Sequence, residues 1–197
     1  MGRPSKPIIS KERAASAALE VIDEEGLDGL SLQRVAKKIG VKAPSLYYHF
    51  NNKADMMASV ARLILKQAYV PDIELEPDWR EFLVRQCIAS RRSILRHPNA
   101  APLMLQFFPR HLMLGAYEHW IQKYDVSPEL QMLVLDGTEK LTFGSALLGA
   151  MSRASGLAPL PPFDAETHEH LATAVTANAY DEDAMFEESV RRFLSAF

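Results

Sequence analysis

The chain has 197 residues, of which 48% are hydrophobic and 24% are charged; this composition excludes a disordered or fibrous protein. No apolar run approaches the roughly 20 residues needed to cross a bilayer, the N-terminus MGRPSKPIIS lacks the apolar stretch of a signal peptide, and the one cysteine cannot close an intrachain disulfide. The net charge of −3 is divided unevenly, because residues 1–53 carry +3 and the rest carry −6. We therefore expect a soluble, cytoplasmic protein whose N-terminal part can bind a polyanion.

Apolar residues recur at three- and four-residue intervals between Gly and Pro breaks, without the alternation of strands, which predicts an all-α fold. Ser10 is expected to cap a first helix that ends at Gly26. Ser31 is expected to cap a second, short helix that ends at Gly40. A third helix is expected from Ala43, with Pro44 in its first turn. Three helices with a tight turn at Gly40 predict a helix-turn-helix unit.

A fourth helix, over 53–69, is long enough to connect this unit to a helical body. Further helices are expected over 78–97, 99–108, 110–124, 128–155, 165–179 and 183–196. The stretch LAPLPPF at 157–163 must be a loop, because its prolines lack backbone donors and favour extended conformations. The domain prediction is a DNA-binding domain at 1–53, a connecting helix at 54–70, and a ligand-binding and dimerisation domain at 71–197.

The segment 31–50, SLQRVAKKIGVKAPSLYYHF, is the most informative part of the chain. Ala36 suits a close contact between two helices, Gly40 suits the turn, and the following residues present polar and aromatic groups. Together with its flanks, GLDGLSLQRVAKKIGVKAPSLYYHFNNKADM resembles the DNA-binding domain of TetR-family regulators. The resemblance covers residues 10–60 and implies sequence-specific binding to operator DNA.

The resemblance also implies individual DNA contacts, which agree with the chemistry of the side chains. Candidates for base edges and thymine methyl groups are Gln33, Ala43, Pro44, Ser45 and Tyr48. Candidates for phosphate contacts are Lys42, Tyr47, His49 and Lys53. Arg3, with Lys6, lies in a basic arm that resembles those that enter a minor groove. The alternatives are that one tyrosine of the pair packs inward, that His49 only ends a helix, and that Lys37 and Lys38 form a solvated face.

The segment 100–124 concentrates Met, Phe, Tyr and Trp, which suits the lining of an apolar cavity. The predicted apolar contacts to a ligand are Met104, Phe107, Phe108, Met113, Tyr117 and Trp120, and the predicted polar contacts are Gln86 and Ser90. The alternative is that these side chains only pack against one another.

The segment DWREFLVRQCIASRRSILRHP resembles the first body helix of the tetracycline-repressor subgroup of the family. By that resemblance, the drug- and metal-contacting positions fall at Tyr69, Met104 and Leu148. None of these side chains is a good Mg²⁺ ligand. The sequence therefore predicts no metal and no cofactor, and an unidentified small apolar ligand with Tyr69 as a hydrogen-bonding group.

The helices at 128–155 and 183–196 resemble the pair that forms the family's dimer interface. Small residues along the first and an apolar stripe on the second favour close packing. The prediction is a homodimeric repressor, released from operator DNA by a small apolar ligand. The alternative keeps the DNA-binding head but makes the body a protein-interaction or constitutive dimerisation module. An enzyme is not expected, because no nucleophile elbow, phosphate loop or metal-ligand spacing accompanies the histidines.

Overall fold

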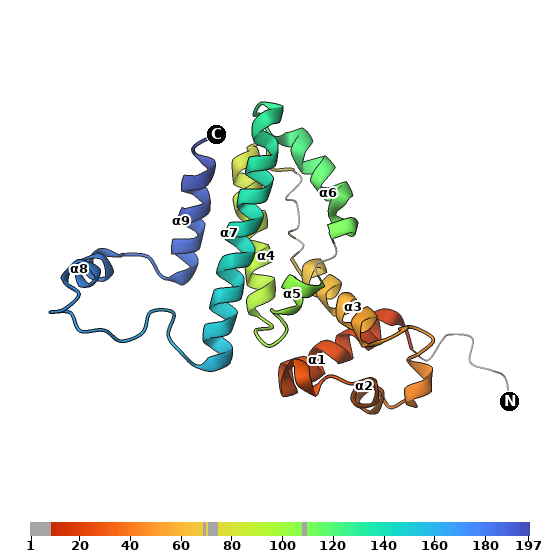
Figure 1. The fold of residues 1–197 in the computed structure, drawn as a ribbon. Coiled ribbons are helices and arrows are strands. Elements are labelled where there is room, and N and C mark those ends of the chain that lie inside the picture. The colour runs from red at the N-terminus through yellow and green to blue at the C-terminus, as the bar shows by residue number, and fades with distance from the viewer. Residues whose placement is uncertain (1–8, 69, 71–74, 108–109) are drawn as a thin grey trace.

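The computed structural model describes residues 9–68, 70, 75–107 and 110–197, and these residues form helices joined by loops, with no strand among them. The all-α fold predicted from the sequence is confirmed. The N-terminal helices form a head at one end of the molecule, and the remaining helices form a body beside it (Figure 1).

The head consists of α1 (Lys11–Gly29), α2 (Leu32–Ile39), a short 3-10 helix η1 (Ala43–Ser45) and α3 (Lys53–Lys66). The predicted caps are confirmed: the hydroxyls of Ser10 and Ser31 accept hydrogen bonds from the backbone N–H groups of Arg13 and Arg34. Gly40 ends α2 in the left-handed region at φ 73°, which glycine adopts without steric cost.

The prediction of a third regular helix from Ala43 is wrong in its detail. Ala43–Ser45 is a 3-10 turn, and residues 46–49 continue as hydrogen-bonded turns. The backbone bonds from Ser45 N to Lys42 O and from Leu46 N to Ala43 O span three residues rather than four. Bonds that span three residues wind the backbone more tightly than an α-helix does, and Pro44 is compatible with the first turn of either kind of helix.

The body consists of α4 (Trp79–Leu95), α5 (Leu103–Gln106), α6 (Arg110–Lys123), α7 (Pro128–Ser155), α8 (Glu169–Ala177) and α9 (Glu182–Leu194). The predicted bounds of α7 are confirmed, and the Pro-rich loop at 157–163 is non-helical. The helix expected over 99–108 is reduced to the single turn α5, because hydrogen-bonded turns occupy 98–102. Helices α4 and α7 lie side by side with α9 against them, and α6 extends from near the upper end of α7 along the side away from α9 (Figure 1).

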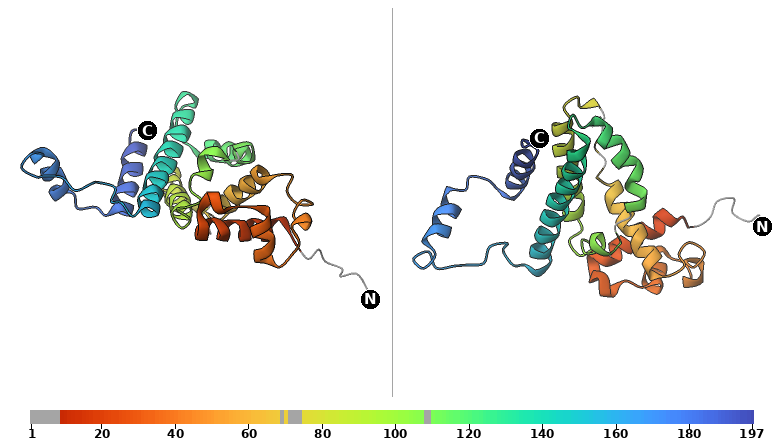
Figure 2. Two further views of the ribbon diagram at one scale, coloured as in Figure 1. Left: turned by 60° about the horizontal axis from the view of Figure 1, so that its bottom comes forward. Right: turned by 45° about the horizontal axis from the view of Figure 1, so that its top comes forward.

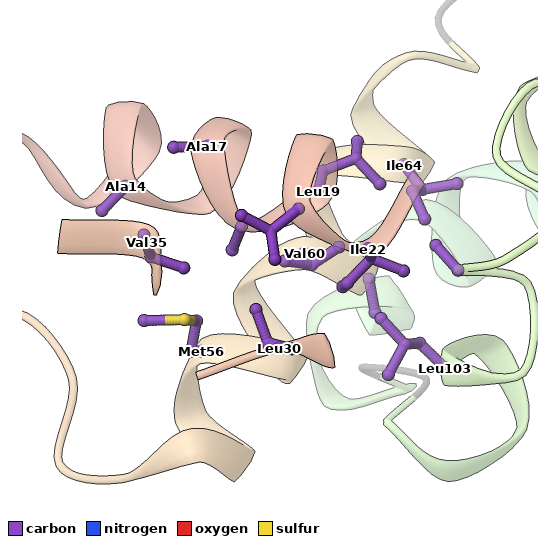
Figure 3. Packing of buried hydrophobic residues seen from close by; sticks show 14 of the residues in the cluster. Ala14, Ala17, Leu19, Ile22, Leu30, Val35, Met56, Val60, Ile64 and Leu103 are labelled. Carbon is purple, nitrogen blue, oxygen red and sulfur yellow. The ribbon is translucent and has the colours of Figure 1, made fainter. Parts of the chain in front are cut away.

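One hydrophobic core runs without a break from the head into the body. Ile22 of α1, Val60 and Ile64 of α3, and Leu103 of α5 point toward one another (Figure 3). Buried residues of α4 and α7, including Ile94 and Ala146, complete this cluster. Because α3 packs along α1, it shares the core of the head. The predicted domain limits at 53 and 70 stay a prediction.

Arg91 of α4 is buried, with 1% of its surface exposed, and joins three helices. Its guanidinium donates to Glu182 and Asp183 at the start of α9 and to Ser145 Oγ of α7 at 2.9 Å. It also lies 5.1 Å from the ring centre of Phe186. Burial alone would raise the pKa of Asp183, but Arg91 and the neighbouring Arg92 lower it overall. This cluster fixes the N-terminus of α9 against α4 and α7.

The apolar stripe of α9 packs inside the chain rather than on its surface. Phe186, Val190 and Leu194 are buried against α4 and α7. Gly137 of α7 lies directly against the ring of Phe193, so that a side chain at this position would collide with it. The close helix approach predicted for a dimer interface therefore occurs, at this point, between α7 and α9 of one chain.

Helix α8 stands apart from α4, α7 and α9 in every view (Figures 1 and 2). None of its residues is buried. Among the described residues, no helix combines the length and apolar character that crossing a membrane requires.

Candidate DNA-binding surface and ligand cavity

The recognition segment, residues 42–50, is anchored to the head by two side chains and exposes two others. Leu46 and Phe50 are buried at 0% and 1% exposure, whereas Tyr47 and Tyr48 are 55% and 89% exposed. The side-chain amine of Lys11 lies 5.3 Å from the ring centre of Phe50. The alternation results from turns that bring Leu46 and Phe50 to the same side. Both tyrosines are thus available to a partner, as predicted from the sequence.

The other predicted DNA-contact residues lie on α2, in the recognition segment and at the start of α3. Gln33, Lys42, Pro44 and Lys53 are exposed, and Ala43, Ser45 and His49 are half-buried. Lys53 Nζ also lies 3.4 Å from the carbonyl oxygen of Leu27, which accepts its hydrogen bond. Arg3 and Lys6 lie outside the described residues.

Two basic residues of α2 are engaged within the head. Lys38 pairs with Glu24 and Glu20 of α1 at 2.7 and 3.4 Å, and the hydrogen bond that it donates to Glu24 is the main cause of its raised pKa. Arg34 donates to Glu25 and to the carbonyl of Gly29. These contacts hold α2 on α1, so Lys38 forms ion pairs within the head in addition to the solvent contact expected from the sequence.

The start of α3 is tied to the recognition segment and to α1. Asn52 caps α3 by accepting from Asp55 N at 2.9 Å. Lys11 Nζ lies 3.1 Å from Asp55 Oδ1. Burial would raise the pKa of Asp55, but the bonds from Lys11 and from the backbone N–H of Asn51 lower it overall. The recognition segment therefore sits in a fixed position between α2 and α3.

A cavity of about 100 Å³ lies in the body between the C-terminal end of α3 and helices α4, α6 and α7. Most of its lining is apolar, which is typical of small-molecule sites. It is lined by Leu65, Ala68, Leu83, Gln86, Cys87, Ser90, Met113, Trp120, Leu135, Thr138, Glu139, Thr142 and Phe143.

The structure brings four of the predicted ligand residues to this cavity: Gln86, Ser90, Met113 and Trp120. Tyr117 is adjacent, since its ring lies 6.0 Å from that of Trp120. Met104 is buried in the core shared with the head, and Phe107 packs against that core. Leu148 is 70% exposed on the outside of α7. Tyr69 and Phe108 lie outside the described residues.

The sequence analysis did not predict the cavity-lining residues of α7, nor those at and just after the C-terminal end of α3. Leu135, Thr138, Glu139 and Thr142 recur at spacings of three and four, so they share one face of α7. The same spacing is typical of a helix packed in a filled core. No pattern in the sequence therefore distinguished these residues from ordinary core positions.

The polar groups of the cavity differ in the hydrogen bonds that they make within the protein. The amide of Gln86 donates to Ser90 Oγ at 3.3 Å, and the hydroxyl of Thr138 donates to the backbone of its own helix. Glu139 accepts from the hydroxyl of Tyr117, and Thr142 Oγ1 is buried without a hydrogen-bond partner. Burial, with the hydrogen bond to Glu139, strongly raises the pKa of Tyr117, so this hydroxyl stays a donor. Burial raises the pKa of Cys87 to about 11.

A second cavity, of about 410 Å³, lies where the head meets the body. The end of α1, residues 98–105 and the C-terminal part of α7 line it. Its lining holds Asn99 but no charged side chain.

The outer face of α7 exposes apolar side chains along much of its length. Leu133, Leu148 and Met151 are 52%, 70% and 64% exposed. Gly144 shares this face of the helix with them. A Cβ atom added at Gly144 would meet no other atom within 4 Å, so the face is open there. An exposed apolar stripe of this kind marks an interaction surface.

Comparison with known proteins places these features in a family context. Residues 15–60 match a family model described as "Bacterial regulatory proteins, tetR family". The tetracycline repressor protein class A from transposon 1721 of Escherichia coli is 33% identical over 86 residues, which are 43% of this chain and 40% of that protein. The match thus spans less than half the length of this relative.

Solved structures extend the likeness over nearly the whole chain. The Streptomyces coelicolor TetR family protein ActR, in complex with actinorhodin, has a TM-score of 0.72 and 24% identity, with 97% of each chain covered. BioQ with its natural double-stranded DNA operator has a TM-score of 0.59 and 24% identity, covering 74% of this chain and 90% of that one. At these identities the likeness shows that the fold is shared.

Proposed function

We propose that this chain is a member of the TetR family of bacterial regulatory proteins, and that it is a sequence-specific DNA-binding repressor that leaves its operator when a small ligand binds in the body. It acts as a homodimer, and as a DNA-binding regulator it works in the cytoplasm. BioQ bound to its operator and ActR bound to actinorhodin support the two halves of this proposal.

One observation carries the proposal: α3 joins the recognition segment to the cavity. The helix begins at Lys53, directly after the recognition segment, and Leu65 and Ala68 at its other end line the cavity. Fourteen residues of α-helix span about 20 Å. A ligand that displaces the cavity end of α3 would therefore tilt the head relative to the body.

The first cavity is the better candidate for the ligand site. It brings several polar groups together within an apolar lining, which is the arrangement that orients a small molecule. The larger cavity at the junction of head and body offers only Asn99 for this purpose.

The proposal is tested by titrating ligands into the protein bound to a selected operator fragment and following the complex by band shift. A genuine ligand should weaken operator binding by about 5- to 150-fold, the range of ordinary allosteric couplings. A ligand that binds in the cavity without changing operator affinity would favour the alternative, a constitutive dimerisation or protein-interaction body.

A polar joint between head and body is a candidate route for this coupling. His97, which follows α4, places Nδ1 at 2.7 Å from Asp23 Oδ2 of α1 and Nε2 at 3.1 Å from Gln67 Oε1, just after α3. Asn99 donates to the carbonyl oxygen of Asp23 at 3.0 Å. The joint therefore connects the end of α4, a helix that lines the cavity, to α1 and to the end of α3.

Asp23→Asn should reduce the ligand-induced loss of operator affinity at least threefold, because it removes the charged acceptor that joins α1 to His97. The affinities for operator alone and for ligand alone should each change less than threefold. Band shifts with and without ligand, plus calorimetry of ligand binding, give all three values. Glu24→Gln is the matched control, because Glu24 pairs with Lys38 inside the head. Equal coupling in Asp23→Asn and wild type would remove the joint from the mechanism.

We assign the dimer interface to the outer face of α7, which was predicted from the sequence together with the C-terminal helix. Leu148→Glu should convert the dimer to a monomer, because it places a charge in the middle of the apolar stripe. Light scattering after size exclusion measures the mass. Leu75→Glu is the control, since Leu75 is 77% exposed but lies outside α7. A Leu148→Glu protein that stays dimeric would place the interface elsewhere.

A further inference from the structure

The cavity of the proposed ligand site carries one negative side chain on an otherwise apolar lining. Glu139 is the only ionisable acid or base among the lining residues apart from Cys87. Its side chain is 14% exposed. A carboxylate held in such an environment is costly unless a positive group or hydrogen-bond donors compensate it.

The negative charge of Glu139 is only partly compensated in the structure, and the compensating cation lies on the solvent side. Arg110 of α6 lies 3.3 Å from Glu139 Oε2, but its side chain is 70% exposed and does not line the cavity. Water therefore screens much of its attraction. The Tyr117 hydroxyl donates to Glu139 Oε1. Among the described residues, the lining of the cavity thus holds one carboxylate and no basic side chain.

A second unused polar group lies on the same wall. Thr142 is 3% exposed, and its buried hydroxyl has no nitrogen or oxygen partner, although it lies close enough to the Cys87 thiol to oppose the effect of burial on the pKa of that thiol. Thr142 follows Glu139 by three residues, so the two side chains project from neighbouring positions on one face of α7. Thr138 already donates to its own helix, and Gln86 donates one bond to Ser90. Glu139 and Thr142 thus offer an occupant a charged and a neutral polar group on one wall.

The opposite walls suit the apolar part of a molecule that carries a positive group. Leu65, Leu83 and Met113 provide aliphatic surface, and Trp120 provides an aromatic ring. Tyr117 lies edge-on to Trp120 with ring centres 6.0 Å apart. Aromatic faces beside a carboxylate attract a cation in addition to the charge pair.

We propose that the ligand of this cavity is an amphipathic cation, an apolar body bearing a protonated amine that binds Glu139 and donates to Thr142. This inference rests on the proposed function, because it names the class of ligand for the same site. It differs from the sequence-based expectation of a small apolar ligand with hydrogen-bonding contacts, because that expectation did not include Glu139.

The test uses three naphthalenes of matched shape and different charge: 1-naphthylmethylamine, 1-naphthylmethanol and 1-naphthoate. Calorimetry at pH 7 with the full-length protein measures each affinity. The amine should bind at least about tenfold more tightly than the alcohol, in line with the strength of hydrogen bonds to charged groups. The carboxylate should bind most weakly, because Glu139 repels it.

Two variants assign the preference to the residue. Glu139→Gln should abolish the advantage of the amine and leave the affinity for the alcohol within about threefold, which also shows that the cavity is still folded. Arg110→Gln, at an exposed position, should raise the affinity for the amine a few-fold by removing the competing cation.

Equal binding of all three compounds would overturn the charge preference while leaving the cavity as a ligand site. Tightest binding of the carboxylate would overturn it as well and indicate recognition by Arg110. Binding of none of the three would remove the ligand response from the proposed function, whereas operator binding, measured separately, would still stand.

Discussion

Replacing Tyr48 with alanine should weaken operator binding at least about 30-fold. Tyr48 is 89% exposed on the recognition segment, so its side chain is not held by packing in the free protein. A side chain that contacts a base or phosphate contributes about 1–3 kcal/mol. Because a dimer presents two copies to the two half-sites, the loss is doubled. Fluorescence anisotropy with the selected operator at one fixed salt concentration measures the effect.

The same variant should leave the rest of the protein unchanged. The unfolding midpoint and the dimer mass should match those of the wild type, because removal of an exposed side chain leaves no cavity. Tyr180→Ala, at a 45% exposed tyrosine of the body, is the matched control and should bind the operator normally. Operator affinity within threefold of wild type for Tyr48→Ala would mean that the DNA-binding surface lies elsewhere on the head.

Replacing Arg91 with methionine should lower the free energy of unfolding by about 2–3 kcal/mol. The substitution removes the buried cation that joins Glu182, Asp183 and Ser145, at the cost typical of breaking a buried ion pair. The two acids are 46% and 47% exposed, so water recovers part of that cost. Urea denaturation at constant protein concentration provides the measurement.

Arg92→Met is the control for this prediction, because Arg92 also pairs with Asp183 but is 59% exposed. It should cost less than about 1 kcal/mol. If Arg91→Met and Arg92→Met lower the free energy of unfolding by the same amount, the burial of Arg91 contributes nothing to stability.

The effect of Arg91 should also depend on pH in a defined direction. Its charge lowers the pKa of Asp183 in the folded protein against the opposing effect of burial. A lowered pKa contributes stability above the ordinary carboxyl value of about 3.9 and loses it as the pH falls below that value. The stability difference between wild type and Arg91→Met should therefore shrink below about pH 4 and stay constant near neutrality.

The head could be predicted from the sequence because its signals are local. Ser10 and Ser31 cap helices by bonding to backbone groups three residues away, and Gly40 adopts a conformation that few other residues accept. The recognition segment departed from the expected regular helix, because its first backbone bonds, from Ser45 and Leu46, span three residues rather than four. Even this departure left Tyr47 and Tyr48 on the outside, as predicted.

The cavity could be predicted only in part, because its lining depends on contacts between distant segments. Gln86 and Trp120 were identified from a segment rich in aromatic residues and the polar residues near it. Met104 comes from the same aromatic-rich segment as Trp120, yet its side chain is buried in the core that includes residues of α1. Leu148 was assigned to a ligand position by resemblance, and the structure places it on the outer face of α7. Which face of a long helix meets a cavity is decided by its neighbours rather than by its own periodicity.

The most direct test of the account is a selection of randomised double-stranded DNA with the purified full-length protein, followed by binding to the enriched sequence at several salt concentrations. The account predicts an enriched inverted repeat whose half-sites are about one DNA turn or more apart, bound by one dimer and far more tightly than unrelated DNA. Recovery of no common sequence, with only weak and strongly salt-dependent binding, would contradict the claim that this chain is a sequence-specific repressor.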